Sequence, residues 1–381
     1  MSAPVSKAIE VGTAITLRDL PAVLRIAAAK RRSVFLLSTP GVGKTEVITG
    51  LAGEAKAKLV VLVASLLDRL DLAGLPYTYQ DKSGKTVTGF APMALMADLS
   101  QEHNPDGGPV WLYLNELNAA ADLSVTPTLY RLIAERAVGS LTLRDNVFIV
   151  ADGNPASSLS AGRDMHMAMR RRFQWFTVRA DLGAWRDWAL NHGVDARVPA
   201  FLGVPAYAPH FSNFDPANRT ALTFGCPATW ARLGADLEEI ERVTDEGLTL
   251  AMICGQVGEK AGTDFAGFLA HAGKIPDAYA VLDDPAKAPI PKEIDRLSLL
   301  CGGIVNLCVK TADLTEQALR YALRLHEVEG IGGHAEFALF LARSLAAMPK
   351  TKAAMLESRH LAKLAKIVAG DKFAVEAFQA A

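Results

Sequence analysis

The sequence of residues 33–46 is Ser33-Val34-Phe35-Leu36-Leu37-Ser38-Thr39-Pro40-Gly41-Val42-Gly43-Lys44-Thr45-Glu46. A short apolar run is followed by a turn rich in glycine, and Lys44-Thr45 then opens a helical pattern. This order of strand, loop and helix is typical of a phosphate-binding P-loop, the Walker A motif. Backbone N–H groups of such a loop point inward and, with the helix N-terminus, form a concave anion site. The stretch therefore predicts a site for a polyphosphate.

The residues of this loop have separate expected tasks. Gly41 and Gly43 let the backbone approach the β-phosphate, Lys44 reaches the β- and γ-phosphates, and the Thr45 hydroxyl binds Mg²⁺. Ser38 stands where the usual pattern has its first glycine. The alternative is a glycine-rich turn that binds no ligand, and the correct offset of Lys44-Thr45 argues against it. The candidate nucleotide-binding residues are Thr39, Pro40, Gly41, Val42, Gly43, Lys44, Thr45 and Glu46.

A second motif ends the apolar run Val110-Trp111-Leu112-Tyr113-Leu114-Asn115-Glu116. In P-loop ATPases the corresponding pair is usually Asp-Glu, in which the Asp holds the Mg²⁺ shell and the Glu polarises the attacking water. Asn115 lacks the negative charge that favours a hard cation, although its amide can still bond a metal-bound water. We expect Glu116 to be the catalytic base and Asn115 to lie at the metal site. The alternative is a buried strand that simply ends in polar residues.

Two further candidates follow along the chain. Asn154 comes after the apolar run of residues 147–150, where it would orient the attacking water or the γ-phosphate; alone, Asn154-Pro155 is equally a simple turn.

Arg172 ends a basic run before the expected strand of residues 174–178. An arginine there would stabilise the transferring phosphoryl group in a neighbouring subunit. The alternative is a solvated helix end whose cations favour the helix dipole.

The pattern of the chain predicts an α/β core followed by helices. Expected helices over residues 20–29 and 44–57 alternate with continuous apolar runs such as residues 59–64, as in a buried parallel sheet. Residues 75–90 alternate in polarity around a turn at residues 82–85, which predicts an inserted β-hairpin. From residue 181 onward the pattern is helical.

The composition excludes several classes of protein. The chain has 381 residues, with 40 Lys and Arg against 41 Asp and Glu, so it shows no basic face for nucleic acid. Four cysteines without a Cys-x-x-Cys pair indicate reduced thiols, and a metal there is not expected. With no apolar run long enough for a bilayer, we expect a soluble, cytoplasmic protein.

Taken together, the motifs resemble those of a MoxR-type AAA+ ATPase, in particular the group encoded beside von Willebrand factor A-like partner proteins. The resemblance covers roughly residues 20–340. It rests on residues 39–45, Leu114-Asn115-Glu116-Leu117-Asn118, Gly153-Asn154-Pro155, Arg172-Phe173 and residues 226–230.

The resemblance implies a P-loop αβα core with a parallel sheet, followed by an all-helical lid. It also implies ATP and Mg²⁺ as ligands and a ring, usually a hexamer, that remodels or activates a partner. Asn154 would be sensor 1 and Arg172 the arginine finger, with Arg171 as a less favoured substitute. The expected parts are an N-terminal extension (1–19), the core (20–203, with a hairpin near 75–92), a connector (204–225), the lid (226–340) and a C-terminal helical extension (341–381).

Two residues depart from the family pattern. Asn115 replaces its Asp, and Ala228 replaces the Arg that follows Pro in its sensor-2 segment. Both changes should slow hydrolysis more than binding. One alternative function is therefore a nucleotide-controlled assembly scaffold with weak or no hydrolysis. A McrB-like AAA+ subunit linked to nucleic acid is a weaker alternative, since the chain has no basic stripe.

Overall fold

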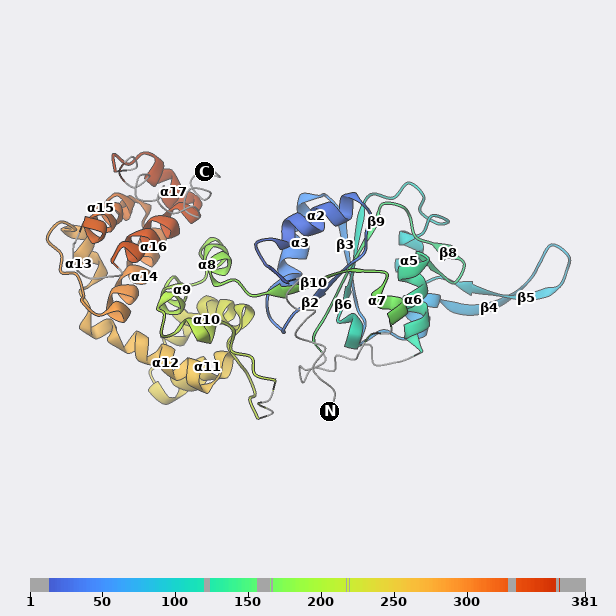
Figure 1. Cartoon of the computed structure of the whole chain (residues 1–381), viewed down its shortest axis with the longest axis horizontal. Helices are drawn as coiled ribbons and strands as arrows, with labels where there is room; N and C mark the ends of the chain where they lie inside the picture. Colours follow the sequence, from blue (N-terminus) through green and yellow to red (C-terminus); the bar gives the residue numbers. More distant parts are fainter. Residues whose placement is uncertain are drawn as a thin grey trace. The chain divides into compact units, whose positions relative to one another are not determined.

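The structure is a computed structural model that describes residues 14–119, 124–155, 165, 167–216, 218, 220–327, 334–360 and 363 (Figure 1). The chain divides into two compact units, residues 1–181 and residues 182–381. Among the described residues, no helix is both long enough and apolar enough to cross a membrane.

The first unit is built on a six-stranded sheet whose strands are all parallel. In spatial order the strands are β1 (Ala14–Thr16), β10 (Gln174–Arg179), β2 (Val34–Leu37), β9 (Val147–Gly153), β6 (Val110–Asn115) and β3 (Lys58–Val63). The central strands β2, β9 and β6 are buried along almost their whole length. Their continuous apolar sequence suits a sheet that is covered on both faces.

Helices cover both faces of this sheet (Figure 1). On one face, α2 (Leu20–Ala29) and α3 (Lys44–Glu54) share a core with Trp111, Tyr113 and Val150. On the other, α4 (Arg69–Ala73), α5 (Ala94–Leu99) and α6 (Val125–Ala134) share a core with Leu112 and Leu114. Successive residues of β6 point to opposite faces, as strand geometry requires. The expected α/β core is therefore confirmed, with three layers in the order helices, sheet, helices. Its smaller elements are η1 (Leu117–Ala119), β7 (Ala137–Val138), β8 (Leu141–Thr142) and α7 (Met167–Arg170).

The expected hairpin is present and projects from the first unit (Figure 1). β4 (Leu75–Gln80) pairs antiparallel with β5 (Thr86–Ala91). At its tip, the Asp81 carboxylate accepts hydrogen bonds from the backbone N–H groups of Ser83 and Lys85, at 2.8 and 3.0 Å. Gly84 adopts a φ of +79° there, which favours glycine. The predicted turn is thus confirmed.

All regular secondary structure among the described residues of the second unit is helical. Its first elements are α8 (Leu182–Asn191), α9 (Arg197–Gly203), η2 (Ala208–Ser212), α10 (Pro227–Ile240), α11 (Glu246–Val257) and α12 (Glu259–Leu269). They are followed by η3 (Ala270–Lys274), α13 (Ala278–Asp283), α14 (Ile294–Lys310), η4 (Ala312–Leu314), α15 (Thr315–Glu327), α16 (His334–Ala347) and α17 (Pro349–Leu356). This arrangement agrees with the expected all-helical lid.

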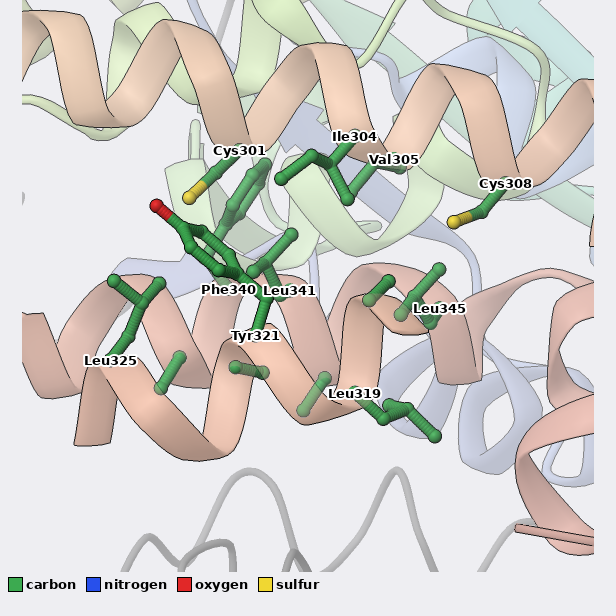
Figure 2. Close-up of a cluster of buried hydrophobic side chains, with 14 of the residues drawn as sticks. Cys301, Ile304, Val305, Cys308, Leu319, Tyr321, Leu325, Phe340, Leu341 and Leu345 are labelled. Atoms are coloured by element: carbon green, nitrogen blue, oxygen red, sulfur yellow. The ribbon is translucent and has the colours of Figure 1, made fainter. Parts of the chain in front are cut away.

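Cysteines form part of the core of the second unit. Figure 2 shows Cys301 and Cys308 on α14, pointing toward side chains of α15 and α16. Both are fully buried, and burial raises the pKa of both thiols, that of Cys308 to about 12. Cys226 is also buried, whereas Cys254 on α11 is only half-buried. The seven-residue spacing of Cys301 and Cys308 therefore marks a shared apolar face.

The division between the units falls earlier than the expected end of the core at residue 203. Leu190 on α8 and Ala200 on α9 belong to the same apolar cluster as α14, so both helices are part of the second unit. The expected boundary at residue 340 falls inside α16, where Phe340 and Leu341 share that cluster. Apolar packing therefore joins the expected lid and the described part of the expected C-terminal extension.

Candidate functional site

The loop after β2 has the backbone of an anion site. Gly41 and Gly43 adopt φ values of +74° and +106°, a region that residues with a Cβ rarely occupy. Helix α3 begins at Lys44, and no side chain caps it. The first N–H groups of a helix have no acceptor within the helix. This end of α3 therefore offers donors and a positive dipole to a phosphate.

Lys44 is almost completely buried at the start of α3, with 8% of its surface exposed. Its ammonium donates a hydrogen bond to Ser38 Oγ and lies 3.3 Å from Asp152 Oδ2. A buried ammonium is costly unless it is paired and hydrogen-bonded. Ser38, which replaces the usual glycine, thus provides one of the two partners of Lys44.

Asp152 is the residue of this site that the sequence motifs missed. It lies on β9 opposite Leu36 of β2 and is 4% exposed. Its Oδ1 accepts hydrogen bonds from the Glu116 backbone N–H at 2.8 Å and from Asn115 Nδ2 at 3.2 Å. The sequence held one signal for Asp152, which is an acidic residue at the end of a continuous apolar strand. A carboxylate that is buried there needs a partner, and this requirement points to a site.

Thr45 and Asn115, the two predicted metal-site residues, are linked through Tyr113. The Tyr113 hydroxyl lies 3.2 Å from Thr45 Oγ1 and accepts a hydrogen bond from Asn115 Nδ2 at 2.8 Å. Burial, followed by the charge of Asp152, raises the pKa of Tyr113, which therefore stays a neutral phenol. The structure thus brings both predicted residues to the loop.

The described residues contain no group of three His, Cys, Asp or Glu side chains that would hold a metal unaided. Mg²⁺ in phosphate sites usually takes phosphate oxygens, waters and one or two protein ligands. The Thr45 hydroxyl and the nearby carboxylate of Asp152 fit that type of site.

Glu116 has an unusual backbone at the end of β6. Its φ is +53°, which is uncommon for a residue with a side chain. Its Oε2 accepts a hydrogen bond from Ser65 Oγ at 3.3 Å, and its N–H donates to Asp152. Such conformations cost about 1–3 kcal/mol and concentrate at functional sites.

Asn154 is held in place by Asn118 of η1. Asn118 Nδ2 donates to the Asn154 carbonyl at 2.7 Å, and its Oδ1 accepts from the Asn154 N–H at 3.3 Å. Gly153 allows this approach, since a Cβ there would lie 2.1 Å from Asn118 Oδ1. Asn118 therefore sets the position of the Asn154 backbone.

Arg172 lies apart from the residues above. It precedes Gln174, which pairs with Val34 at the start of β2, whereas the loop follows the end of β2. Arg172 is exposed and lines a cavity of about 370 Å³. The other arginines of that cavity are Arg31, Arg32, Arg136 and Arg171. Arg172 therefore does not join the loop of its own chain.

Comparisons with known proteins found no matching family model and no matching curated protein. Among solved structures, the chain is similar to the RuvB P216G mutant of Thermotoga maritima, with 14% identity over 74% of this chain and 80% of that one, at a TM-score of 0.37. It is also similar to a protein named "putative ATPase" from Cytophaga hutchinsonii, with 13% identity over 88% of this chain and 78% of that one, at a TM-score of 0.28. At these TM-scores neither likeness supports a functional argument. The fold class rests on the sheet and the loop described above.

Proposed function

We propose that this chain is an AAA+ ATPase of MoxR type, which hydrolyses ATP in an oligomeric ring to remodel or activate a partner protein. The main support is the convergence of Lys44, Thr45, Glu116 and Asn154 at the carboxyl ends of three neighbouring strands, β2, β6 and β9. Ligands of open α/β sheets bind at this edge of the sheet.

In this proposal residues 39–46 bind ATP, and Lys44 neutralises charge on its β- and γ-phosphates. Thr45 and Asn115 lie at the Mg²⁺ site, where the cation would neutralise phosphate charge. Glu116 takes a proton from the attacking water, and Asn154 orients that water or the γ-phosphate. These side chains act by position and charge, which are the main requirements of phosphoryl transfer.

Arg172 would act on the nucleotide of a neighbouring subunit, because it is exposed and does not join its own loop. Activity then requires assembly, and a ring closes such head-to-tail contacts. On the sequence resemblance we propose a hexamer and a von Willebrand factor A-like protein as partner. We propose a cytoplasmic location on the sequence pattern, namely cysteines typical of reduced thiols and apolar runs too short for a bilayer.

The test is ATP turnover by the purified chain over a range of protein concentrations, with Mg²⁺. Turnover per chain should rise with assembly and fall at least about 100-fold in Glu116→Gln and Arg172→Ala, since each removes a group that acts in the transition state. Arg171→Ala is the matched control, because Arg171 is also exposed and lines the same cavity. Equal losses in Arg171→Ala and Arg172→Ala would contradict the role of Arg172.

A nucleotide-controlled scaffold with little hydrolysis is the second candidate. It is favoured by the neutral Asn115 and by Ala228, which lies exposed in the first turn of α10 and brings no cation. In that case Lys44→Ala disrupts the oligomer, whereas Glu116→Gln changes neither assembly nor the low turnover. Size-exclusion chromatography with light scattering measures the loss of the oligomer in Lys44→Ala, and ATP turnover in Glu116→Gln, unchanged for a scaffold but lost for an ATPase, distinguishes the two candidates.

A further inference from the structure

We propose that Asp152 supplies the negative charge of the Mg²⁺ site, the charge that Asn115 cannot supply. The inference rests on the proposed function, because it requires a nucleotide at the loop. It assigns the cation to a side chain of β9, one strand away from the expected position at the end of β6.

The sheet places Asp152 where it can serve this purpose. β9 lies between β2, which leads into the loop, and β6, which ends at Asn115. Leu114 pairs with Ala151, so Asn115 and Asp152 are the next neighbours along these strands. Asn115 lies two residues after Tyr113, and Asp152 lies two residues after Val150; Tyr113 and Val150 belong to the core beneath α3. Because side chains two residues apart on a strand share a face, Asn115 and Asp152 point to the face of the sheet that carries α3.

The hydrogen bonds divide the tasks between these two side chains. Asn115 Nδ2 donates both to Tyr113 and to Asp152, at 2.8 and 3.2 Å. Asn115 therefore acts here as a donor that orients its neighbours. Asp152 accepts hydrogen bonds on Oδ1, and its Oδ2 faces the Lys44 ammonium at 3.3 Å. A carboxylate is a better ligand for a hard cation or its waters than an amide.

Lys44 and Asp152 already form a pair, with 3.3 Å between Nζ and Oδ2. An ammonium has three N–H donors; one of them donates to Ser38, and Asp152 lies beside the ammonium as its counter-ion. A phosphate that accepts a hydrogen bond from Lys44 also neutralises the ammonium, so Lys44 depends less on Asp152 as its counter-ion. Oδ2 then becomes available to the cation that accompanies the phosphates.

The competing interpretation is that Asp152 serves only to neutralise the buried Lys44. The two roles differ in their effect on nucleotide affinity. A residue that only pairs with Lys44 changes ATP affinity equally with and without Mg²⁺. We call the ratio of the ATP affinity with Mg²⁺ to the ATP affinity without Mg²⁺ the Mg²⁺ advantage. A residue of the cation site changes this ratio.

The experiment measures ATP binding to the full chain by calorimetry, once with Mg²⁺ and once with EDTA. We expect Asp152→Asn to reduce the Mg²⁺ advantage about tenfold, the equivalent of one charged contact. The double variant Asp152→Asn with Asn115→Asp, which moves the carboxylate to β6, should restore it. The control is Asn104→Ala, which removes an amide hydrogen bond to the carboxylate of Asp98, outside the loop, and should leave the advantage within about threefold of the wild type.

The outcomes are separable. A full Mg²⁺ advantage in Asp152→Asn, or an equal loss of the advantage in Asn104→Ala, overturns the inference. If Asp152→Asn does not fold, the double variant decides: ATP binding in EDTA with no Mg²⁺ advantage overturns the inference, and a restored advantage supports it. Wild-type binding without any Mg²⁺ advantage overturns this inference alone. The absence of wild-type ATP binding in both conditions overturns the proposed function itself.

Discussion

At the scale of single residues, the site depends on side chains that hold other residues in place. Asn118 makes both of its amide hydrogen bonds to the backbone of Asn154. The close approach requires glycine at position 153, as the 2.1 Å separation from a Cβ there shows. Asn118 is thus a positioning residue for the proposed sensor.

We expect Asn118→Ala to lower ATP turnover about 10- to 100-fold, because a displacement of about 1 Å of a group that orients the reactants has an effect of this size. The affinity for ATP should change little, so kcat falls while the Kd is retained. Asn146→Ala is a suitable control, since Asn146 also donates its amide to a backbone carbonyl, that of Gly107 at 2.7 Å. A weaker Kd with unchanged kcat would assign Asn118 to binding.

The sequence predicted the residues that belong to local motifs and missed those that act across strands. Lys44, Thr45 and Glu116 are recognisable from their neighbours in the chain. Asp152 is separated from Lys44 by more than 100 positions, and its role follows from β9 lying between β2 and β6. Because strand order is set by tertiary packing, a single sequence does not provide it.

At the scale of elements, most helices and strands followed from hydrophobic periodicity. α2 matches its prediction at both ends, and β6 and β10 match within a residue. β1 and α13 were missed because they have three and six residues, too few to show a period. The early division at residue 181 was also missed, since the packing of α8 and α9 involves helices far away in the sequence.

Asp195 joins two elements of the second unit. Just before α9, it accepts hydrogen bonds from Arg197 Nε at 3.0 Å and from Asn306 Nδ2 of α14 at 2.8 Å. Burial opposes its ionisation, but the hydrogen bonds and charge of Arg197 and the bond from Asn306 outweigh burial and hold its pKa below the usual 3.8. The charged form of Asp195 therefore stabilises the fold.

A lowered pKa in the folded state sets the direction of the pH dependence. The contribution of Asp195 to stability is complete above pH 3.8 and is lost as the pH falls through the lower folded pKa. We expect the unfolding free energy of the second unit to decrease over this range, and to decrease less in Asp195→Asn. Denaturant unfolding of both proteins at pH 6 and below pH 3.8 measures the difference. Equal pH dependence in both proteins would contradict the assignment.

At the scale of the whole molecule, the proposed function requires a site that is shared between subunits. Under that proposal, Glu116 would belong to the subunit that binds the nucleotide, and Arg172 would come from the next one. A chain with Arg172→Ala and a chain with Glu116→Gln each lack one half of every site. Mixed assemblies, however, contain complete sites.

We expect the two inactive variants to recover activity when mixed. In an equal mixture, random assembly places an intact Glu116 against an intact Arg172 at about one interface in four. Turnover should approach about a quarter of the wild-type value if interfaces act independently. The measurement is ATP turnover against mixing ratio, with each variant alone as the control. No recovery, while mixed oligomers form, would contradict action between subunits.

The burial of three of the four cysteines has a practical consequence for spectroscopy. Thiolates are the reactive form, and Cys301 and Cys308 are buried with raised pKa values, while Cys226 is buried as well. A maleimide dye added to the folded protein should therefore attach to Cys254 on α11 without any cysteine being removed. The natural chain thus carries a single labelling position in its helical unit, from which fluorescence can follow nucleotide-dependent motion.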